Sequence, residues 1–351
     1  MLPSFSRIIE QEKAKEMLRR ALGGNKLAHA YLFRGPGGVG KKSAARALAA
    51  RLNCSGATGD KSPPAAIEAT VPTGGGISLE ACGRCPSCLK FASGNHPDFL
   101  QILPSGAAIK IDQVREVKKA LSYPPLEGGF RVVLLAEVHT MRREAANSML
   151  KTLEEPPEKS IFILTGDETG GILPTIISRC QVVPFFPLSH QGLAAMLTGE
   201  TELDPRAALT LAAVAEGSLG RARMLLERDL LTLRRRVFAM LTERREQEPE
   251  VIPMVMGLAE ECAELKEQLP DFLDLLASCF HDLAIWGADA EGEPPPFAIN
   301  RDMMDLLTLG ARRWPPAALD RRLHSFRRAK SQLKRNCNRS MVCEVLFFDL
   351  F

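Results

Sequence analysis

The sequence is poor in aromatic residues, which make up 6% of its 351 residues and include only two tryptophans and two tyrosines. Its hydrophobic core must therefore be mainly aliphatic. The sequence also lacks an apolar run of about 18 residues, the length that a membrane-spanning helix needs, and residues 1–13 lack the apolar stretch of a secretion signal. These absences predict a soluble cytoplasmic protein with no membrane partner.

An excess of charge of either sign is also missing. The 45 Lys and Arg residues nearly balance the 42 Asp and Glu residues, so the formal net charge is +3. Bulk charge therefore does not predict nucleic-acid binding, and any contact with DNA must come from a local group of basic residues. Charged residues make up 25% and hydrophobic residues 45%, which excludes a largely disordered chain.

Strand and helix patterns alternate in the first half of the chain. Short apolar runs predict strands at residues 29–33, 99–103, 131–136 and 161–165. Amphipathic or alanine-rich patterns predict helices at residues 7–22, 43–52, 112–122 and 143–154. Because strands that alternate with helices form parallel sheets, residues 1–187 are predicted to be an α/β domain. Residues 55–81 are rich in Gly, Pro and Ala, and we expect them to form an exposed, mobile insertion.

The strand patterns end after Pro184 and Pro187. Residues 188–230 predict a small domain of short helices, and residues 231–351 predict a third, all-helical domain. An acidic, proline-rich stretch at residues 288–296 interrupts this last domain. The predicted fold class is therefore α/β plus all-α, in three domains.

The strongest local motif is the segment 35–41, GPGGVGK, which matches G-x-x-x-x-G-K between a predicted strand and a predicted helix. Glycines allow backbone N–H groups to turn toward phosphates at a helix N-terminus, and Lys41 can reach the β and γ phosphates. The residues predicted to bind nucleotide are Gly35, Gly37, Gly38, Val39, Gly40, Lys41, Lys42 and Ser43. The alternative is a glycine-rich turn that only begins a helix.

Two departures from this motif concern Mg²⁺. Lys42 stands where a Ser or Thr hydroxyl normally binds the ion, and Ser43 comes one residue late. The run at residues 132–137 is typical of a Walker B strand, but Ala136 replaces its first acid. Glu137 stands at the position of the catalytic, water-polarising carboxylate, although a surface carboxylate at a strand end is the alternative. We therefore expect weak binding of ATP or ADP, without Mg²⁺ and with little hydrolysis.

Four cysteines have the spacing of a metal site. Cys82, Cys85 and Cys88 form C-x₂-C-x₂-C, and Cys54 ends the helix before the insertion. Four thiolates suit a closed tetrahedral Zn²⁺ site, which leaves no position for a reacting water, so a structural zinc is predicted. Unligated thiols and an iron–sulfur cluster are the alternatives. The single cysteines are predicted to lie in a core or an interface: Cys180, Cys262, Cys279, Cys337 and Cys343.

One segment carries a family resemblance. Residues 147–157, NSMLKTLEEPP, closely resemble the N-A-L-L-K-T-L-E-E-P-P segment of bacterial DNA polymerase III clamp-loader subunits, which are P-loop proteins of the AAA+ type. Ser178-Arg179-Cys180 resembles their S-R-C motif, and residues 217–222 resemble their sensor 2 segment. An amphipathic helix stopped by two prolines would explain residues 147–157 alone, but not this conjunction.

The resemblance implies an AAA+ P-loop domain at residues 1–187 with a zinc module at 54–88, a helical lid at 188–230 and a helical collar at 231–351. It implies that Thr165 and Arg221 also contact nucleotide. Arg179, which we expect after the sheet's final strand, would act in trans as an arginine finger on ATP held by a neighbouring subunit, and a structural ion pair is the alternative. The implied partners are the gamma/tau motor subunits and the delta subunit in a ring, the sliding clamp and primed DNA.

Within this family the departures favour one type of subunit. Lys42 and Ala136 favour the delta prime type over an active gamma/tau motor, as does an end at Phe351 without a proline-rich extension.

A stand-alone DNA-binding ATPase is the remaining alternative. It is suggested by the basic residues Arg321, Arg322, Arg327, Arg328, Lys330, Lys334 and Arg335 on one predicted helix. Apolar residues on the same helix favour a solvated or subunit-facing surface instead. Arg115, Lys118 and Lys119 could touch DNA phosphates, but a solvated helix face is again favoured.

Overall fold

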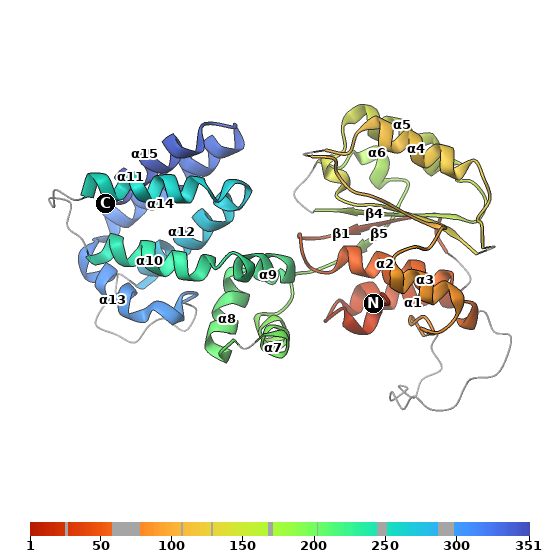
Figure 1. Cartoon of the computed structure of the whole chain (residues 1–351), viewed down its shortest axis with the longest axis horizontal. Coiled ribbons are helices and arrows are strands. Elements are labelled where there is room, and N and C mark those ends of the chain that lie inside the picture. Colours follow the sequence, from red (N-terminus) through yellow and green to blue (C-terminus); the bar gives the residue numbers. More distant parts are fainter. Residues whose placement is uncertain are drawn as a thin grey trace. The chain divides into compact units, whose positions relative to one another are not determined.

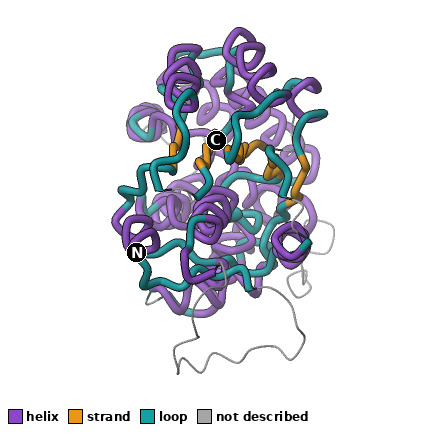
Figure 2. The backbone as a smooth tube through the Cα atoms, turned by 90° about the vertical axis from the view of Figure 1, so that its right-hand side faces the viewer, coloured by secondary structure: helices purple, strands orange, loops and turns teal. Residues whose placement is uncertain are grey.

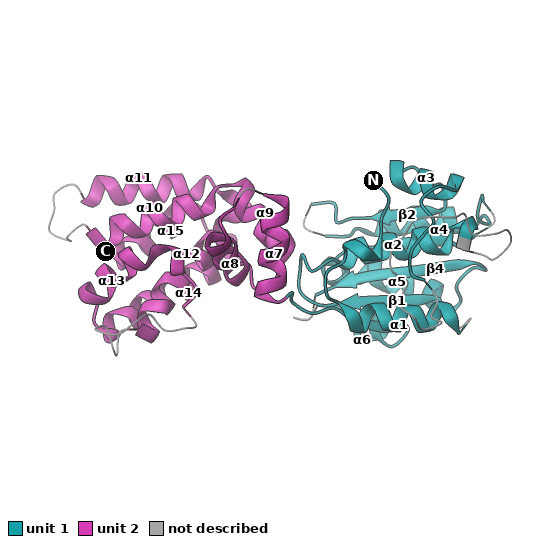
Figure 3. Ribbon diagram, turned by 90° about the horizontal axis from the view of Figure 1, so that it is seen from below, with its two compact units in different colours: residues 1–188 teal, residues 189–351 magenta. Residues whose placement is uncertain are grey.

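The computed structural model describes residues 1–24, 27–57, 78–106, 108–127, 129–167, 171–201, 203–243, 251–286 and 298–351. These residues form two compact units, Met1–Leu188 and Ser189–Phe351 (Figure 3). Helix makes up most of the described backbone, and the strands are short (Figure 2). Most of the predicted insertion and all of the predicted interruption at 288–296 lie outside the described residues.

Unit 1 is built on a five-stranded sheet with the order β2-β3-β4-β1-β5. The strands are β1 (Ala30–Arg34), β2 (Phe99–Ile102), β3 (Arg131–Leu135), β4 (Ser160–Gly166) and β5 (Gln181–Pro184). All four neighbouring pairs in this sheet are parallel, as the alternation of strands and helices predicts.

Helices cover both faces of this sheet. In Figure 1, α1, α2 and α3 lie on one face, and α4, α5 and α6 lie on the other. Their bounds are α1 (Glu12–Gly23), α2 (Lys41–Leu52), α3 (Pro86–Ser93), α4 (Ile111–Leu121), α5 (Arg143–Glu154) and α6 (Pro174–Ile177), with short 3₁₀ helices at Phe5–Arg7, Ser55–Ala57 and Val138–Thr140. Helix α1 begins later than predicted because Glu10 and Gln11 have left-handed backbones, with φ of 56° and 55°.

Strand β5 is absent from the sequence-based prediction. It lies at the sheet edge, pairs with β1 and ends in Pro184. An edge strand tolerates proline, because the missing N–H is not needed by a second neighbour. The expectation that Arg179 follows the final strand is therefore wrong: Arg179 lies between α6 and β5.

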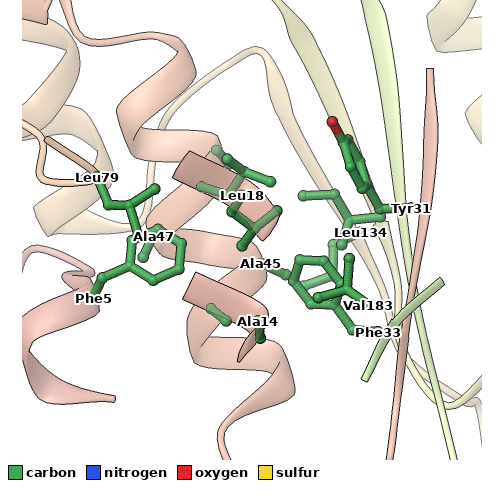
Figure 4. Close-up of a cluster of buried hydrophobic side chains, with 14 of the residues drawn as sticks. Phe5, Ala14, Leu18, Tyr31, Phe33, Ala45, Ala47, Leu79, Leu134 and Val183 are labelled. Carbon is green, nitrogen blue, oxygen red and sulfur yellow. The ribbon is translucent and has the colours of Figure 1, made fainter. Parts of the chain in front are cut away.

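Each face of the sheet carries its own apolar cluster. Tyr31 and Phe33 of β1 pack on the face of α1 and α2, whereas Leu32 packs on the face of α4 and α5. Figure 4 shows the first cluster, in which Leu18 of α1 and Ala45 of α2 lie toward the strands. Because both faces of the sheet are covered, its central strands β3 and β4 are buried along their whole length and are mainly apolar.

Unit 2 is helical throughout its described residues. Its helices are α7 (His190–Glu200), α8 (Pro205–Val214), α9 (Leu219–Glu227), α10 (Leu230–Glu243), α11 (Val251–Ala263), α12 (Leu269–Trp286), α13 (Met304–Arg313), α14 (Pro316–Lys334) and α15 (Arg339–Leu350), with 3₁₀ helices at Lys266–Gln268 and Arg301–Met303. The ring of Phe280 lies 5.2 Å from Trp314 and 5.5 Å from Phe326, so α12, α14 and the end of α13 share one core. The division into lid and collar stays a prediction.

None of the helices in the described ranges combines the length and the apolar character that a membrane-spanning segment needs.

Candidate nucleotide and metal sites

The loop between β1 and α2 has a conformation that depends on glycine. Gly40 caps α2 with φ of 99°, and Gly38 has φ of 74°. A Cβ on Gly35 would lie 2.1 Å from the carbonyl oxygen of Phe185, which follows β5. The loop is thus held against β5 at the carboxyl edge of the sheet, and it leads into a helix N-terminus that is suited to phosphate.

The Lys41 side chain points into this loop. Its Nζ donates to the carbonyl oxygens of Gly35 and Pro36, the latter at 2.6 Å, and to Asp167 Oδ1 at 3.0 Å. The side chain is 8% exposed, and this burial lowers the pKa of Lys41, while the hydrogen bond to Asp167 opposes the shift. The charge of the P-loop lysine is therefore compensated from within the protein.

Lys42 forms the second ion pair of the site. Its Nζ lies 2.6 Å from Glu137 Oε1, and the two side chains are 48% and 41% exposed. Ala136 is fully buried and offers no carboxylate, while Ser43 is exposed. A lysine ammonium thus contacts the carboxylate that the sequence predicts for the water-polarising position of a P-loop enzyme.

Thr165 and Asp167 complete this edge of the sheet. Thr165 is buried and its Oγ1 accepts a hydrogen bond from Glu137 N at 3.1 Å, which fixes the backbone at Glu137. Asp167 follows β4, bonds to Lys41 and lies 3.7 Å from Nε2 of His139. Asp167 was not predicted from the sequence. It could have been found as an acid directly after a predicted strand, because the carboxyl ends of parallel strands meet at one edge of the sheet.

Arg179 lies on unit 1, away from the chain's own P-loop. Because β5 is parallel to β1, the residues before β5 lie at the amino edge of the sheet, whereas the P-loop follows β1 at the carboxyl edge. The Nε atom donates to Glu154 Oε1 at 2.8 Å, and Nη1 donates to the carbonyl oxygen of Thr175 at 2.8 Å. The Arg179 side chain is 30% exposed. Such surface pairs are worth about 0–1 kcal/mol, so Glu154 does not prevent Arg179 from turning to another anion.

Arg221 belongs to unit 2 and has acidic neighbours there. Its guanidinium lies 3.2 Å from Asp271, 3.4 Å from Glu216 and 3.6 Å from Asp274. Its side chain is mostly buried. These contacts join α9 to α12, and the predicted contact of Arg221 with nucleotide stays a prediction.

The four predicted metal-ligating cysteines come together in unit 1. Their sulfur atoms all lie within 4.8 Å of one another, although Cys54 is far from the others in sequence. The Sγ atoms of Cys82 and Cys88 are 3.9 Å apart. Two sulfurs on a tetrahedral Zn²⁺ with bonds of about 2.3 Å would be about 3.8 Å apart, so the spacing fits. A Cβ on Gly56 would lie 3.1 Å from Cys82 Sγ, so this glycine leaves room for the sulfur.

The electrostatics of these thiols also fit a cation. Burial opposes ionisation of Cys85, but hydrogen bonds from Ser55 and from the Cys88 amide outweigh it and lower its pKa to about 6. Burial, together with a hydrogen bond to Cys85, raises the pKa of Cys88. Four thiolates so close together repel one another, and a divalent cation would relieve that repulsion. The group could therefore hold a metal such as zinc.

Two family models match this chain. The model described as "DNA polymerase III, delta subunit" matches residues 10–189, and the model described as "DNA polymerase III, delta subunit, C terminal" matches residues 228–350. Together they reach into both compact units.

Several curated proteins are similar in sequence. The tau/gamma subunit of DNA polymerase III from Haemophilus influenzae is 33% identical over 263 residues, 74% of this chain and 34% of that protein. The tau subunit from Escherichia coli is 33% identical over 62% of this chain and 31% of its own length. The chain thus spans about a third of the length of these two relatives, 34% of the first and 31% of the second. The delta prime subunit from Bacillus subtilis is 34% identical over 58% of this chain and 55% of its own length.

A solved structure is similar along most of the chain. It is a DNA polymerase III gamma-subunit-related protein from Thermotoga maritima, 15% identical, with 96% of this chain and 97% of that chain covered and a TM-score of 0.39.

Proposed function

Since this chain belongs to the DNA polymerase III delta-subunit family of clamp-loader subunits, P-loop proteins of the AAA+ type, we propose that it is a subunit of the delta prime type. In this role it does not hydrolyse ATP itself and supplies Arg179 to ATP held by a neighbouring subunit.

The position of Arg179 carries this proposal. The residue lies at the amino edge of the sheet, and its own P-loop lies at the carboxyl edge. The four residues of β5 alone separate the two edges by roughly 13 Å, at about 3.3 Å per residue. Because Arg179 lies at the edge opposite its own P-loop, this position supports a role on a nucleotide held by another subunit. There its planar fork would form two charge-assisted hydrogen bonds to the transferring phosphoryl group.

The P-loop supports the second half of the proposal. Lys42 bonds to Glu137, and Ala136 provides no metal ligand, so both protein groups that normally hold Mg²⁺ are missing. An active gamma/tau-type motor is the competing role, and the similarity to tau and tau/gamma proteins favours it. Mg²⁺-dependent turnover by the purified chain that Lys41→Ala abolishes would establish the motor role instead.

The partners of this role are the gamma/tau motor subunits and the delta subunit in a ring, the sliding clamp and primed DNA. Exposed apolar residues on unit 2 suit contact with a neighbouring subunit. They lie on two helices that pack against each other, Ile252 and Met256 on α11 and Met341, Val345 and Phe348 on α15. Met341 is 64% exposed and Phe348 is 48% exposed.

The stand-alone DNA-binding role is less well supported. On the basic helix α14, Arg322 is buried, and its Nε donates to the carbonyl oxygen of Leu350 at 2.8 Å. Lys330 pairs with Asp274. Arg322 and Lys330 thus have structural partners within unit 2. On α4, Arg115 pairs with Asp112, and the solvated helix face favoured there stays a prediction.

A reconstituted loader tests the proposed role. For Arg179→Ala, we expect normal assembly but slower ATP hydrolysis and clamp loading, because an arginine finger contributes about 10³ to 10⁵ in rate at its site. Glu154→Ala is the matched control, since it removes the same ion pair but keeps the arginine. Met341→Glu should instead prevent assembly, which gel filtration would detect.

Two outcomes would overturn the trans role. One is a loader that works at full rate with Arg179→Ala. The other is a Glu154→Ala loader with the same defect as Arg179→Ala, because the ion pair alone would then explain the loss.

A further inference from the structure

Two lysines and two carboxylates form two closed ion pairs at the P-loop. Lys41 Nζ lies 3.0 Å from Asp167, and Lys42 Nζ lies 2.6 Å from Glu137. Glu137 follows β3 and Asp167 follows β4, so both acids lie at the carboxyl edge of the sheet, beside the P-loop. Each acid that could hold a cation here is thus already bound by a lysine.

Among the described residues, no group of replacement ligands is found beside these two acids. Mg²⁺ prefers near-octahedral oxygen coordination, usually with one or two carboxylates and the substrate phosphates. Positions 42 and 136 hold a lysine and an alanine. In the described parts of the chain, only the four cysteines form a group of three or more His, Cys, Asp or Glu side chains close enough to hold a metal. The positive charge beside the loop is therefore that of Lys41 and Lys42.

The Lys42 ammonium is available to a phosphate. The Lys42–Glu137 pair is about half exposed, so water screens the attraction between the two groups. A polyphosphate carries more negative charge than one carboxylate and accepts strong charge-assisted hydrogen bonds from lysine. The helix N-terminus at Gly40 adds a favourable field for an anion.

We propose that this P-loop binds nucleoside di- and triphosphates without a divalent cation, with the Lys42 ammonium in place of Mg²⁺. This inference rests on the proposed function in one respect, since a cation-free site suits a subunit that does not hydrolyse ATP. Glu137 then serves to hold Lys42 when the loop is empty.

Calorimetric titration of the full chain with ATP and with ADP tests the idea. The Mg²⁺-free buffer is prepared with a resin rather than a chelator, because a chelator would also remove metal from the cysteines. We expect the dissociation constants with and without Mg²⁺ to agree within about twofold.

Variants at position 42 sharpen the test. Lys42→Thr should weaken Mg²⁺-free binding by about tenfold, since one charge-assisted contact is lost. Arg46→Thr removes an equal charge one turn further along α2, at an exposed position, and should leave binding unchanged. Glu137→Gln should tighten Mg²⁺-free binding, because it releases Lys42. Lys42→Thr combined with Ala136→Asp should make binding tighter with Mg²⁺ than without it. If this buried aspartate prevents folding, Lys42→Thr alone and Glu137→Gln alone still test the inference.

Three results would overturn the inference: Mg²⁺ tightening wild-type binding by about tenfold or more, no binding in either buffer, or equal effects of Lys42→Thr and Arg46→Thr. None of them bears on Arg179, whose role is read from the assembled loader.

Discussion

Helix α2 has a candidate binding site at each of its ends, and the two sites are built in opposite ways. At its first residues, Lys41 and Lys42 are each paired with a carboxylate. Just after its last residue, Cys54 joins three other cysteines whose sulfurs lie within 4.8 Å of one another. The first site is balanced in charge without a metal, whereas the second brings together four ligands of one kind.

This contrast shows how the need for a cation can be read from a structure. A site whose acids are already bound by lysines gains little from a divalent ion, because the ion must displace those lysines. Clustered thiolates repel one another until a cation lies between them. The end of α2 with the P-loop is therefore expected to be independent of metal, and the end with Cys54 is expected to depend on it.

The largest expected effect is at the cysteine end of α2. For Cys54→Ser, we expect loss of near-stoichiometric bound metal and a large loss of stability, since structural zinc contributes about 10–16 kcal/mol in small zinc-finger peptides. Elemental analysis and thermal unfolding measure the two effects. Cys337→Ser is the control, because Cys337 is exposed and lies outside the group. Wild-type protein purified without chelators that has no metal and four freely alkylated thiols would contradict the zinc assignment.

An intermediate effect is expected at the P-loop end of α2. For Gly35→Ala we expect the free energy of unfolding to fall by at least about 2 kcal/mol. The new Cβ would lie 2.1 Å from the carbonyl oxygen of Phe185 and must push β5 away. Gly37→Ala is the matched control, since its Cβ would meet nothing within 4 Å, and its effect should stay within about 0.5 kcal/mol. Urea unfolding measures both, and equal losses would show that the approach to Phe185 is not what constrains the loop.

Much of the fold is visible in the sequence because it depends on local patterns. Four of the strands come from short, mainly apolar runs, and the glycines of segment 35–41 have a recognisable spacing. The four cysteines were also grouped correctly, since few arrangements other than a shared metal explain their spacing. Strand β5 was missed because its four residues end in proline and have a neighbour on one side only.

The contacts of charged residues were harder to predict, because they depend on tertiary structure. Lys42 and Glu137 are 95 positions apart, and the sequence singled out both without pairing them. Arg322 was predicted to lie on a solvated or subunit-facing surface, but it is buried within unit 2 and lies 5.1 Å from the ring of Trp314. Cys337 was expected in a core or an interface. It is exposed, so it does not lie in a core, and its place in an interface stays a prediction.

The smallest expected effect concerns the stability that the Lys42–Glu137 pair provides. In a double-mutant cycle with Lys42→Met and Glu137→Gln, we expect a coupling below about 1 kcal/mol, because both side chains are about half exposed. The buried pair Asp98–Arg131 is the internal reference, with side chains that are 0% and 6% exposed. Arg131→Met should lower the free energy of unfolding by about 3–5 kcal/mol, because it leaves the buried Asp98 carboxylate without its ion-pair partner. Urea unfolding measures both. A coupling at Lys42–Glu137 as large as the cost at Arg131 would mean that the pair stabilises the fold, and Lys42 would then not be free to turn toward a phosphate.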